Sequence, residues 1–224
     1  MGIIRKTFYT TVLTGASVFG YLGSTTTLIS PLPQDDPFWR SRSFARYNVH
    51  HNACTQDICV KRIPLDKIRP ELLQKEGDLV LEFCRGVWGG LGYKPQRAYL
   101  ARKYQGPATA SQLWTSEQLS KSTYERGTQI TDHFEVVEKT PTDIVVRCGD
   151  TPRNPNPRDS DGLFVISAEV DKQRNEAVLA LKSCFFNSGR KVEGIQGPTP
   201  GWMEEAHRWY TRLWMATGAW RVTR

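Results

Sequence analysis

The stretch LFVISAEVDKQRNEAVLALKSCFF, from Leu163 to Phe186, decides the fold of this chain. Two apolar runs of alternating pattern flank the polar turn DKQRNE, which predicts an antiparallel β-hairpin. The residues expected on its buried face are Phe164, Ile166, Ala168, Val170, Leu179, Leu181 and Phe185. The other face carries Glu169 and Lys182, and we expect Lys182 to be solvated. One face of the hairpin therefore needs a partner elsewhere in the chain.

The last segment, PGWMEEAHRWYTRLWMATGAWRV (residues 200–222), predicts an amphipathic helix that covers this face. Its main apolar stripe is expected to hold Trp202, Trp209, Leu213 and Trp220, with Trp214 beside it. Trp209 and Leu213 would then pack on the hairpin.

The region before the hairpin predicts more of the same sheet and two helices. An alternating strand is expected over 57–65, a helix over 69–90 and a second helix over 94–104. The stretches TQITDHFEVVEKT (128–140) and DIVVRCGD (143–150) predict another hairpin about the turn TPTD.

Four glycines lie between the two predicted helices, in the stretch GVWGGLGY (86–93). A phosphate cradle would need the Lys-Ser/Thr of a P-loop and a preceding strand, and both are missing. We therefore expect these glycines to let two helices meet closely.

The order of strand, two helices, antiparallel strands and long final helix resembles the helix-grip fold of the START-like superfamily. In that fold a curved sheet wraps the last helix and encloses an apolar cavity. The stretches GTQITDHFEVVEKTPTDIVVRCGD and DGLFVISAEV, with the aromatic last helix, also resemble small uncharacterised fungal proteins associated with secondary-metabolite gene clusters. The resemblance covers roughly residues 56–222. It implies an α+β helix-grip domain, and it carries over no catalytic residue.

The N-terminus has a different character. After Arg5 and Lys6, no charge occurs from Thr7 to Gln34, a run longer than the ~20 residues that cross a membrane. We expect a single-pass anchor or targeting segment over 1–33, in the endoplasmic reticulum or a mitochondrial membrane. A cleaved signal peptide and an organelle-targeting presequence are the alternatives.

The remaining division of the chain follows from composition. Residues 34–55 mix prolines, charges and aromatics and predict a linker, and 56–224 would form the START-like domain. In the linker, Phe38 and Trp39 would lie either at a membrane interface or in the globular domain.

Composition argues against several function classes. The net charge is +7, but the basic residues are scattered and no nucleic-acid-binding signature occurs, so we expect no nucleic-acid partner. The stretch HHNACTQDIC (50–59) lacks the repeated spacing of a metal site. No hydrolase, zinc-protease or dinucleotide motif occurs, so we expect neither metal nor cofactor.

Three polar residues within strand patterns are the candidate catalytic residues: His133, Arg147 and Asp150. If the first hairpin is symmetric about TPTD, His133 lies opposite Cys148, and Asp150 lies two residues further on the same face. Such a pair could transfer protons. The alternatives are an exposed strand residue for His133, an ion pair or turn cap for Arg147 and Asp150, and simple packing for His207.

The segment Gly149–Gly162, GDTPRNPNPRDSDG, joins the two hairpins and is too rich in proline for a regular ladder. We expect an exposed, mobile lid, with Arg153, Arg158 and Asp161 at the rim of the cavity.

These features predict a membrane-tethered protein that binds a hydrophobic small molecule and promotes a cofactor-free step, such as cyclisation or isomerisation. The expected ligand contacts are Phe164, Ile166, Leu181, Trp209 and Leu213. The alternatives are a non-catalytic carrier of a lipid or polyketide-like ligand, and an accessory subunit whose partners are membrane-bound biosynthetic enzymes such as oxygenases.

Overall fold

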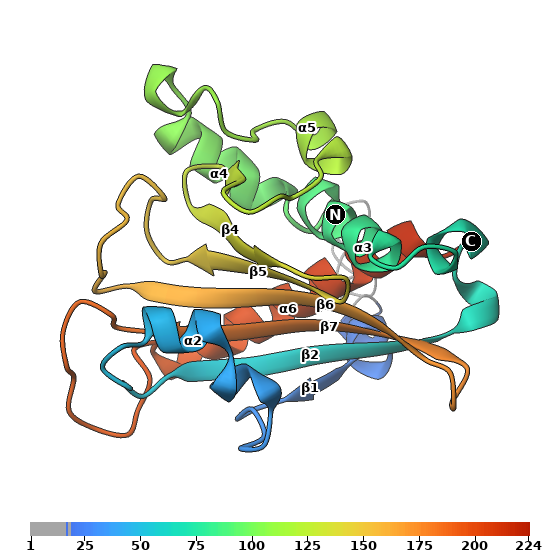
Figure 1. The fold of residues 1–224 in the computed structure, drawn as a ribbon, viewed down its shortest axis with the longest axis horizontal. Coiled ribbons are helices and arrows are strands. Elements are labelled where there is room, and N and C mark those ends of the chain that lie inside the picture. The colour runs from blue at the N-terminus through green and yellow to red at the C-terminus, as the bar shows by residue number, and fades with distance from the viewer. Residues whose placement is uncertain (1–16, 18) are drawn as a thin grey trace, which may run out of the picture.

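The computed structural model describes residue 17 and residues 19–224, which form an α+β structure around one seven-stranded antiparallel sheet (Figure 1). The strand order is β1-β2-β7-β6-β5-β4-β3. The strands are β1 (Thr27–Ile29), β2 (Thr55–Pro64), β3 (Gln129–Ile130), β4 (Phe134–Lys139), β5 (Asp143–Cys148), β6 (Asp161–Asp171) and β7 (Glu176–Phe186). The α-helices that follow β1 in the chain are α2 (Arg42–Tyr47), α3 (Asp78–Gly89), α4 (Lys94–Tyr104), α5 (Ser116–Lys121) and α6 (Gly201–Val222).

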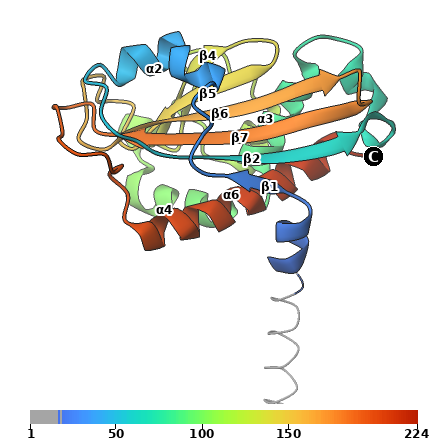
Figure 2. The same ribbon diagram turned by 90° about the horizontal axis from the view of Figure 1, so that it is seen from below.

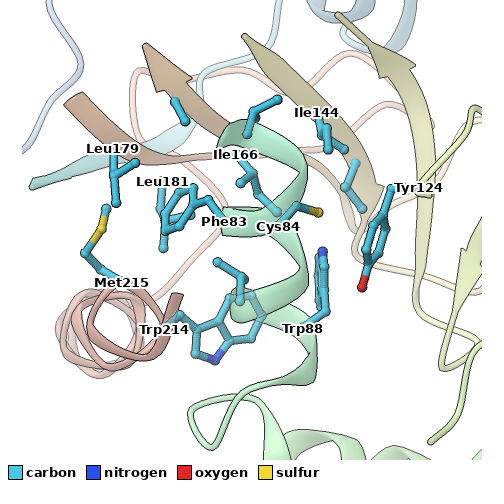
Figure 3. Packing of buried hydrophobic residues seen from close by; sticks show 14 of the residues in the cluster. Phe83, Cys84, Trp88, Tyr124, Ile144, Ile166, Leu179, Leu181, Trp214 and Met215 are labelled. Carbon is cyan, nitrogen blue, oxygen red and sulfur yellow. The ribbon is translucent and has the colours of Figure 1, made fainter. Parts of the chain in front are cut away.

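The predicted central hairpin is confirmed. Strands β6 and β7 pair in the expected register, with Ile166 opposite Leu181 and Ala168 opposite Leu179. Their inward side chains belong to the main core, together with residues of α3 and α6 (Figure 3). Val170 was placed on the buried face, but it lies at the tip of the hairpin and is exposed.

The long helix α6 lies along one face of the sheet, as predicted, and α2 lies on the other face (Figure 2). The order of β2, three helices, five strands and α6 is compatible with a helix-grip fold. The predicted buried stripe of α6 is wrong, since Trp202 is 72% exposed and Trp220 is 80% exposed. The buried residues of α6 are Thr211, Trp214, Met215, Gly218, Ala219 and Val222.

The close approach of α3 to α6 explains why the bulky side chains are turned away. A Cβ atom on Gly218 would lie 2.6 Å from Phe83 Cε2, and one on Gly86 would lie 2.9 Å from Gly218 Cα. Only small residues fit at this crossing. The prediction that the glycines of 86–92 let helices meet is thus confirmed, since Gly90 and Gly92 also contact α6 at Thr217.

The second face of the sheet is also covered, which the sequence pattern did not predict. A 3-10 helix (Pro37–Arg40) and α2 pack over Leu163 and Val165, and Phe38 is buried among them. The segment expected to be a linker is thus ordered against the sheet in this part, and Phe38 lies in the domain. Lys182 is not solvated, because it pairs with Asp36 under this layer.

The first hairpin differs from its prediction at two points. A bulge shifts the register between Val136 and Glu138, and the pairing of β4 with β5 begins at Glu135 with Arg147, so His133 does not pair with Cys148. Residues 131–133 form a turn rather than a continuous strand. Thr131 and Asp132 both have left-handed backbone conformations, with φ of 50° and 51°. The turn is held by the pairing of the Thr131 hydroxyl with the buried Tyr93 hydroxyl, and by a hydrogen bond from the Asp132 N–H to Gln112 Oε1. His133 therefore extends from a turn beside the sheet.

Residues 1–16 and 18 of the predicted anchor over 1–33 lie outside the described residues. The end of that segment is part of the domain instead, since Thr27–Ile29 form β1 paired with β2 and Leu32 is buried. Within the described part of the chain, no helix has both the length and the apolar character needed to cross a membrane.

Candidate functional site

A cavity of about 590 Å³ lies between α6, the inner face of the sheet and the loops at one end of the strands. This volume is within the range typical of small-molecule sites. Its wall is largely aromatic and apolar, with contributions from Phe134, Phe164, Phe185, Met203, Tyr210 and Trp214. Trp214 makes edge-to-face contacts with both Phe164 and Tyr210, so the rings form one continuous surface.

Two histidines are among the polar residues of the wall: His133 from the turn before β4, and His207 from α6. His133 is half-buried, and its ring packs edge-on against Phe134 at 4.9 Å between centroids. Burial lowers its pKa, as does the charge of Arg158, while the carboxylate of Asp150 opposes the shift. His133 is therefore a neutral imidazole near pH 7.

Asp150 lies near His133, as predicted, but is not part of the wall. Its carboxylate accepts hydrogen bonds from the Thr151 N–H (2.7 Å) and from Asn154 Nδ2 (3.0 Å). Burial alone would raise the pKa of Asp150, but these hydrogen bonds and the charge of Arg158 lower it. The charged Asp150 thus acts on His133 through its field.

Arg147 does not join His133 in the cavity. It is 4% exposed and makes a bidentate ion pair with Asp161, at 2.9 and 2.7 Å. Its guanidinium also lies 4.5 Å from the centre of the Tyr47 ring, which packs with the layer over the outer face. These contacts are those of a structural ion pair.

The segment Gly149–Gly162 was predicted to be exposed, and this is wrong at its two anchoring residues. Arg158 is 3% exposed and Asp161 is 1% exposed. The prolines leave carbonyl groups without ladder partners, and arginine has five donors with which to satisfy them. Arg158 donates to the carbonyls of Asp150, Thr151 and Asn154.

The loop nevertheless borders the cavity, because Asp159, Ser160 and Asp161 contribute to its wall. Arg153 is half-exposed and forms a 2.7 Å ion pair with the buried Asp132. The loop is thus a packed wall beside the cavity rather than a loose cover.

The five predicted ligand contacts fall into three groups. Phe164 lies in the cavity wall. Ile166 and Leu181 are fully buried in the core on the same face of the sheet and support the wall from behind. Trp209 contacts Phe19 and Arg212 instead, and Leu213 lies outside the core clusters, because the real buried face of α6 centres on Trp214.

A second polar cluster, which sequence reasoning missed, lies behind His207. Asp57 of β2 and Ser183 of β7 are direct cross-strand partners on the inner face. His207 Nε2 lies 2.9 Å from Ser183 Oγ and 3.8 Å from Asp57 Oδ2. Asp57 is 2% exposed, and its Oδ1 atom has no hydrogen-bond partner among the described residues.

Burial is the main influence on both ionisable groups of this cluster. It lowers the pKa of His207 to about 4, with the charge of Arg208 acting in the same direction. Burial raises the pKa of Asp57 to about 6, against the attraction of Arg208. The signal in the sequence was a carboxylate and a hydroxyl at inward positions of two alternating strands. Their meeting depends on the pairing of β2 with β7, which the alternation alone does not specify.

No group of three or more His, Cys, Asp and Glu side chains suited to a metal ion occurs among residues 17 and 19–224. The five cysteines are free thiols. No protein-family model, curated protein or solved structure matches this chain.

Proposed function

We propose that this protein binds a hydrophobic small molecule in the cavity beneath α6, as a helix-grip domain of the START-like type. The observation that carries the proposal is the 590 Å³ cavity with its continuous aromatic wall. Apolar surface removed from water contributes roughly 25 cal/mol per Å² to binding. A ligand enclosed by these rings would gain most of its affinity in this way.

The charges around the cavity favour an uncharged ligand with few polar groups. Both histidines of the wall are neutral near pH 7, because burial lowers the pKa of each. An anion would meet the exposed carboxylate of Asp159 in the same wall. Burying an unpaired charge is costly, whereas an oxygenated neutral molecule can find hydrogen bonds at the histidines.

We further propose that binding serves a cofactor-free step at a membrane, such as a cyclisation or an isomerisation in fungal secondary metabolism. Its catalytic groups would be the neutral imidazoles of the wall, with Asp150 tuning His133. A carrier without catalysis would need the cavity but no histidine, and an accessory subunit of membrane-bound oxygenases would need neither. Alanine at both His133 and His207 separates the enzyme from the carrier, because it would abolish turnover but leave a carrier the affinity that comes from the apolar wall.

Binding itself is tested with Nile red, an uncharged dye whose fluorescence rises in apolar surroundings. We expect saturable binding to the wild-type protein and at least tenfold weaker binding to Ser160→Trp, which places an indole at the exposed edge of the wall. The matched control is Gln173→Trp, at the exposed turn between β6 and β7. Equal binding by all three proteins would show that the dye lies elsewhere.

A further inference from the structure

The imidazole of His207 is held on one side by a set of polar atoms. Its Nε2 atom lies 2.9 Å from Ser183 Oγ, 3.3 Å from Thr211 Oγ1 and 3.8 Å from Asp57 Oδ2. The ring plane is further fixed by an edge-to-face contact with Phe185, at 5.2 Å between centroids. A side chain that merely filled space would not need three polar neighbours on a single ring atom.

These neighbours determine which nitrogen carries the proton. The Thr211 hydroxyl donates to the carbonyl of His207, at 3.0 Å, so it turns its lone pairs toward Nε2. Asp57 is also an acceptor when ionised. Surroundings rich in acceptors favour the tautomer with the proton on Nε2. The Nδ1 atom then carries a lone pair, and it has no hydrogen-bond partner among the residues that the structure describes.

The His207 ring is placed where a bound ligand could contact it. His207 belongs to the cavity wall, whereas Asp57 and Ser183 are buried behind it, at 2% and 0% exposure. Asp57 and Ser183 are thus out of reach of a ligand, whereas the ring of His207 is within reach.

We infer that His207 is the hydrogen-bond acceptor of the cavity, and that Ser183, Thr211 and Asp57 position it to receive a hydrogen bond from a phenolic hydroxyl of the bound molecule. This inference rests on the proposed ligand binding. The phenol keeps its proton, which points at the Nδ1 lone pair, because burial holds the pKa of His207 at about 4 and the imidazole is a weak base. No covalent bond changes on binding.

Asp57 helps to fix the tautomer that leaves the Nδ1 lone pair free. Its Oδ2 atom lies 3.8 Å from Nε2, and its Oδ1 atom has no partner within the described chain. An ionised carboxylate beside Nε2 favours the proton on that nitrogen. A phenol suits this site better than an alkyl alcohol, because its O–H is more acidic, with a pKa of about 10 as in tyrosine, and is therefore the stronger hydrogen-bond donor.

Other ionisable groups near His207 set its background field. On α6 itself these are Glu204 and Arg208, which form a 3.0 Å ion pair with each other. Across the cavity the titratable wall residues are His133, Cys148, Asp159, Asp161 and Tyr210. Asp57 is the acidic residue within 4 Å of the His207 ring in the described structure. Changing Asp57 therefore alters the charge nearest the imidazole.

The test uses two probes that differ by a single group, 7-hydroxy-4-methylcoumarin and 7-methoxy-4-methylcoumarin. The hydroxyl probe changes its absorption spectrum when it ionises, and the methoxy probe has no proton to give. We expect the wild-type protein to bind the hydroxyl probe at least about tenfold more tightly. His207→Ala should remove that preference, so that the two probes bind this variant with equal affinity.

The pH profile of the bound hydroxyl probe gives a second readout, which a purely structural role would not move. Relative to wild type, the pKa of the bound probe should shift downward by at least about one pH unit in His207→Ala, because a neutral acceptor stabilises the protonated phenol, and in the same direction in Asp57→Asn. Free imidazole added to His207→Ala should raise it again. His50→Ala, at a histidine outside the cavity wall, should match the wild-type protein.

The outcomes separate the inference from the proposed function. If neither coumarin nor Nile red binds, the proposed cavity function fails. If both coumarins bind with equal affinity and ionisation is the same in wild type and His207→Ala, the cavity binds ligands but His207 is not the acceptor. A shift in His133→Ala alone would also overturn the inference, because it would assign the role to the other histidine.

Discussion

The ion pair between Arg147 and Asp161 offers a sharp test of how the proline-rich loop is held. Both side chains are almost fully buried, at 5% and 0% exposure, and their nitrogen and oxygen atoms lie 2.7 Å apart. Changing Asp161 to Ala leaves the guanidinium buried without its charge partner. It also removes the acceptor of the Ser188 hydroxyl, which now bonds Asp161 Oδ2 at 2.5 Å.

The expected cost is large for a single substitution. Breaking a buried ion pair by removing one partner costs about 3–5 kcal/mol. The Ser188 hydroxyl loses its shorter hydrogen bond and keeps the 3.3 Å contact with the Arg158 carbonyl, so its change adds at most about 1 kcal/mol. Arg147 keeps its hydrogen bonds to the carbonyls of Pro155 and Asn156, which limits the loss. We therefore expect Asp161→Ala to lower the free energy of unfolding by about 4 kcal/mol.

The matched control lies two residues away. Asp159 also borders the cavity, but its side chain is 81% exposed and its ion partner Arg190 is 3.9 Å away. Asp159→Ala should cost less than about 0.5 kcal/mol, since exposed ion pairs contribute little. Urea unfolding followed by tryptophan fluorescence measures both variants. If Asp161→Ala and Asp159→Ala differ by less than about 1 kcal/mol, the loop is not anchored by this pair.

Three further predictions address the core and the polar cluster. Gly218→Ala should destabilise the protein by about 1–3 kcal/mol through overpacking against Phe83. The control Gly201→Ala, which has open space around it, should be neutral or slightly stabilising in the same urea assay. Equal effects would mean that α3 and α6 do not cross so closely. Trp214→Ala should lower the free energy of unfolding by about 3–5 kcal/mol, and Trp202→Ser by less than about 0.5 kcal/mol. If thermal unfolding gave the reverse order, the buried stripe predicted from the sequence would be the correct one. Burial raises the pKa of Asp57 to about 6, so the protonated side chain contributes stability at low pH, and this contribution is lost as the pH rises through 6. Burial lowers the pKa of His207 to about 4, so the neutral side chain contributes stability at higher pH, and this contribution is lost as the pH falls through 4. Between pH 4 and 6 the stability of Asp57→Asn should therefore rise more steeply than that of wild type, and that of His207→Ala less steeply; parallel curves would rule out both shifts.

Much of the fold was predictable because it depends on alternation and on a long helical segment. The β6–β7 hairpin follows from side chains that alternate over eleven residues in each strand. Helix α4 begins and ends where its sequence predicts. The spacing of apolar residues in such segments indicates which face of a strand or helix is buried, and so predicts the type of element.

The buried face of α6 could not be predicted from hydrophobicity alone. Its tryptophans occur at helical spacing, yet the helix is placed by the contact of Gly218 with α3. A glycine contributes nothing to an apolar stripe, so the residue that decides the packing is invisible to that pattern. The same holds for the outer face of the sheet, where Phe38 arrives from a segment that looks like a linker.

The candidate site was predicted in part. His133 reaches the cavity and Asp150 lies near it, although a turn with two left-handed residues, rather than a strand, positions His133. Arg147 was grouped with them because it lies close in sequence, but alternation places it on the opposite side of β5. The cluster of Asp57 with His207 joins residues 150 positions apart and could be seen only once the strand register was known.

The most direct test of ligand binding beneath α6 is a crystal structure of the protein with 7-methoxy-4-methylcoumarin bound. We predict electron density for the probe between α6 and the sheet, in contact with Phe164 and Trp214 and beside the ring of His207. Density at another surface, or an empty cavity in crystals grown at a saturating probe concentration, would contradict the proposal that this cavity is a binding site.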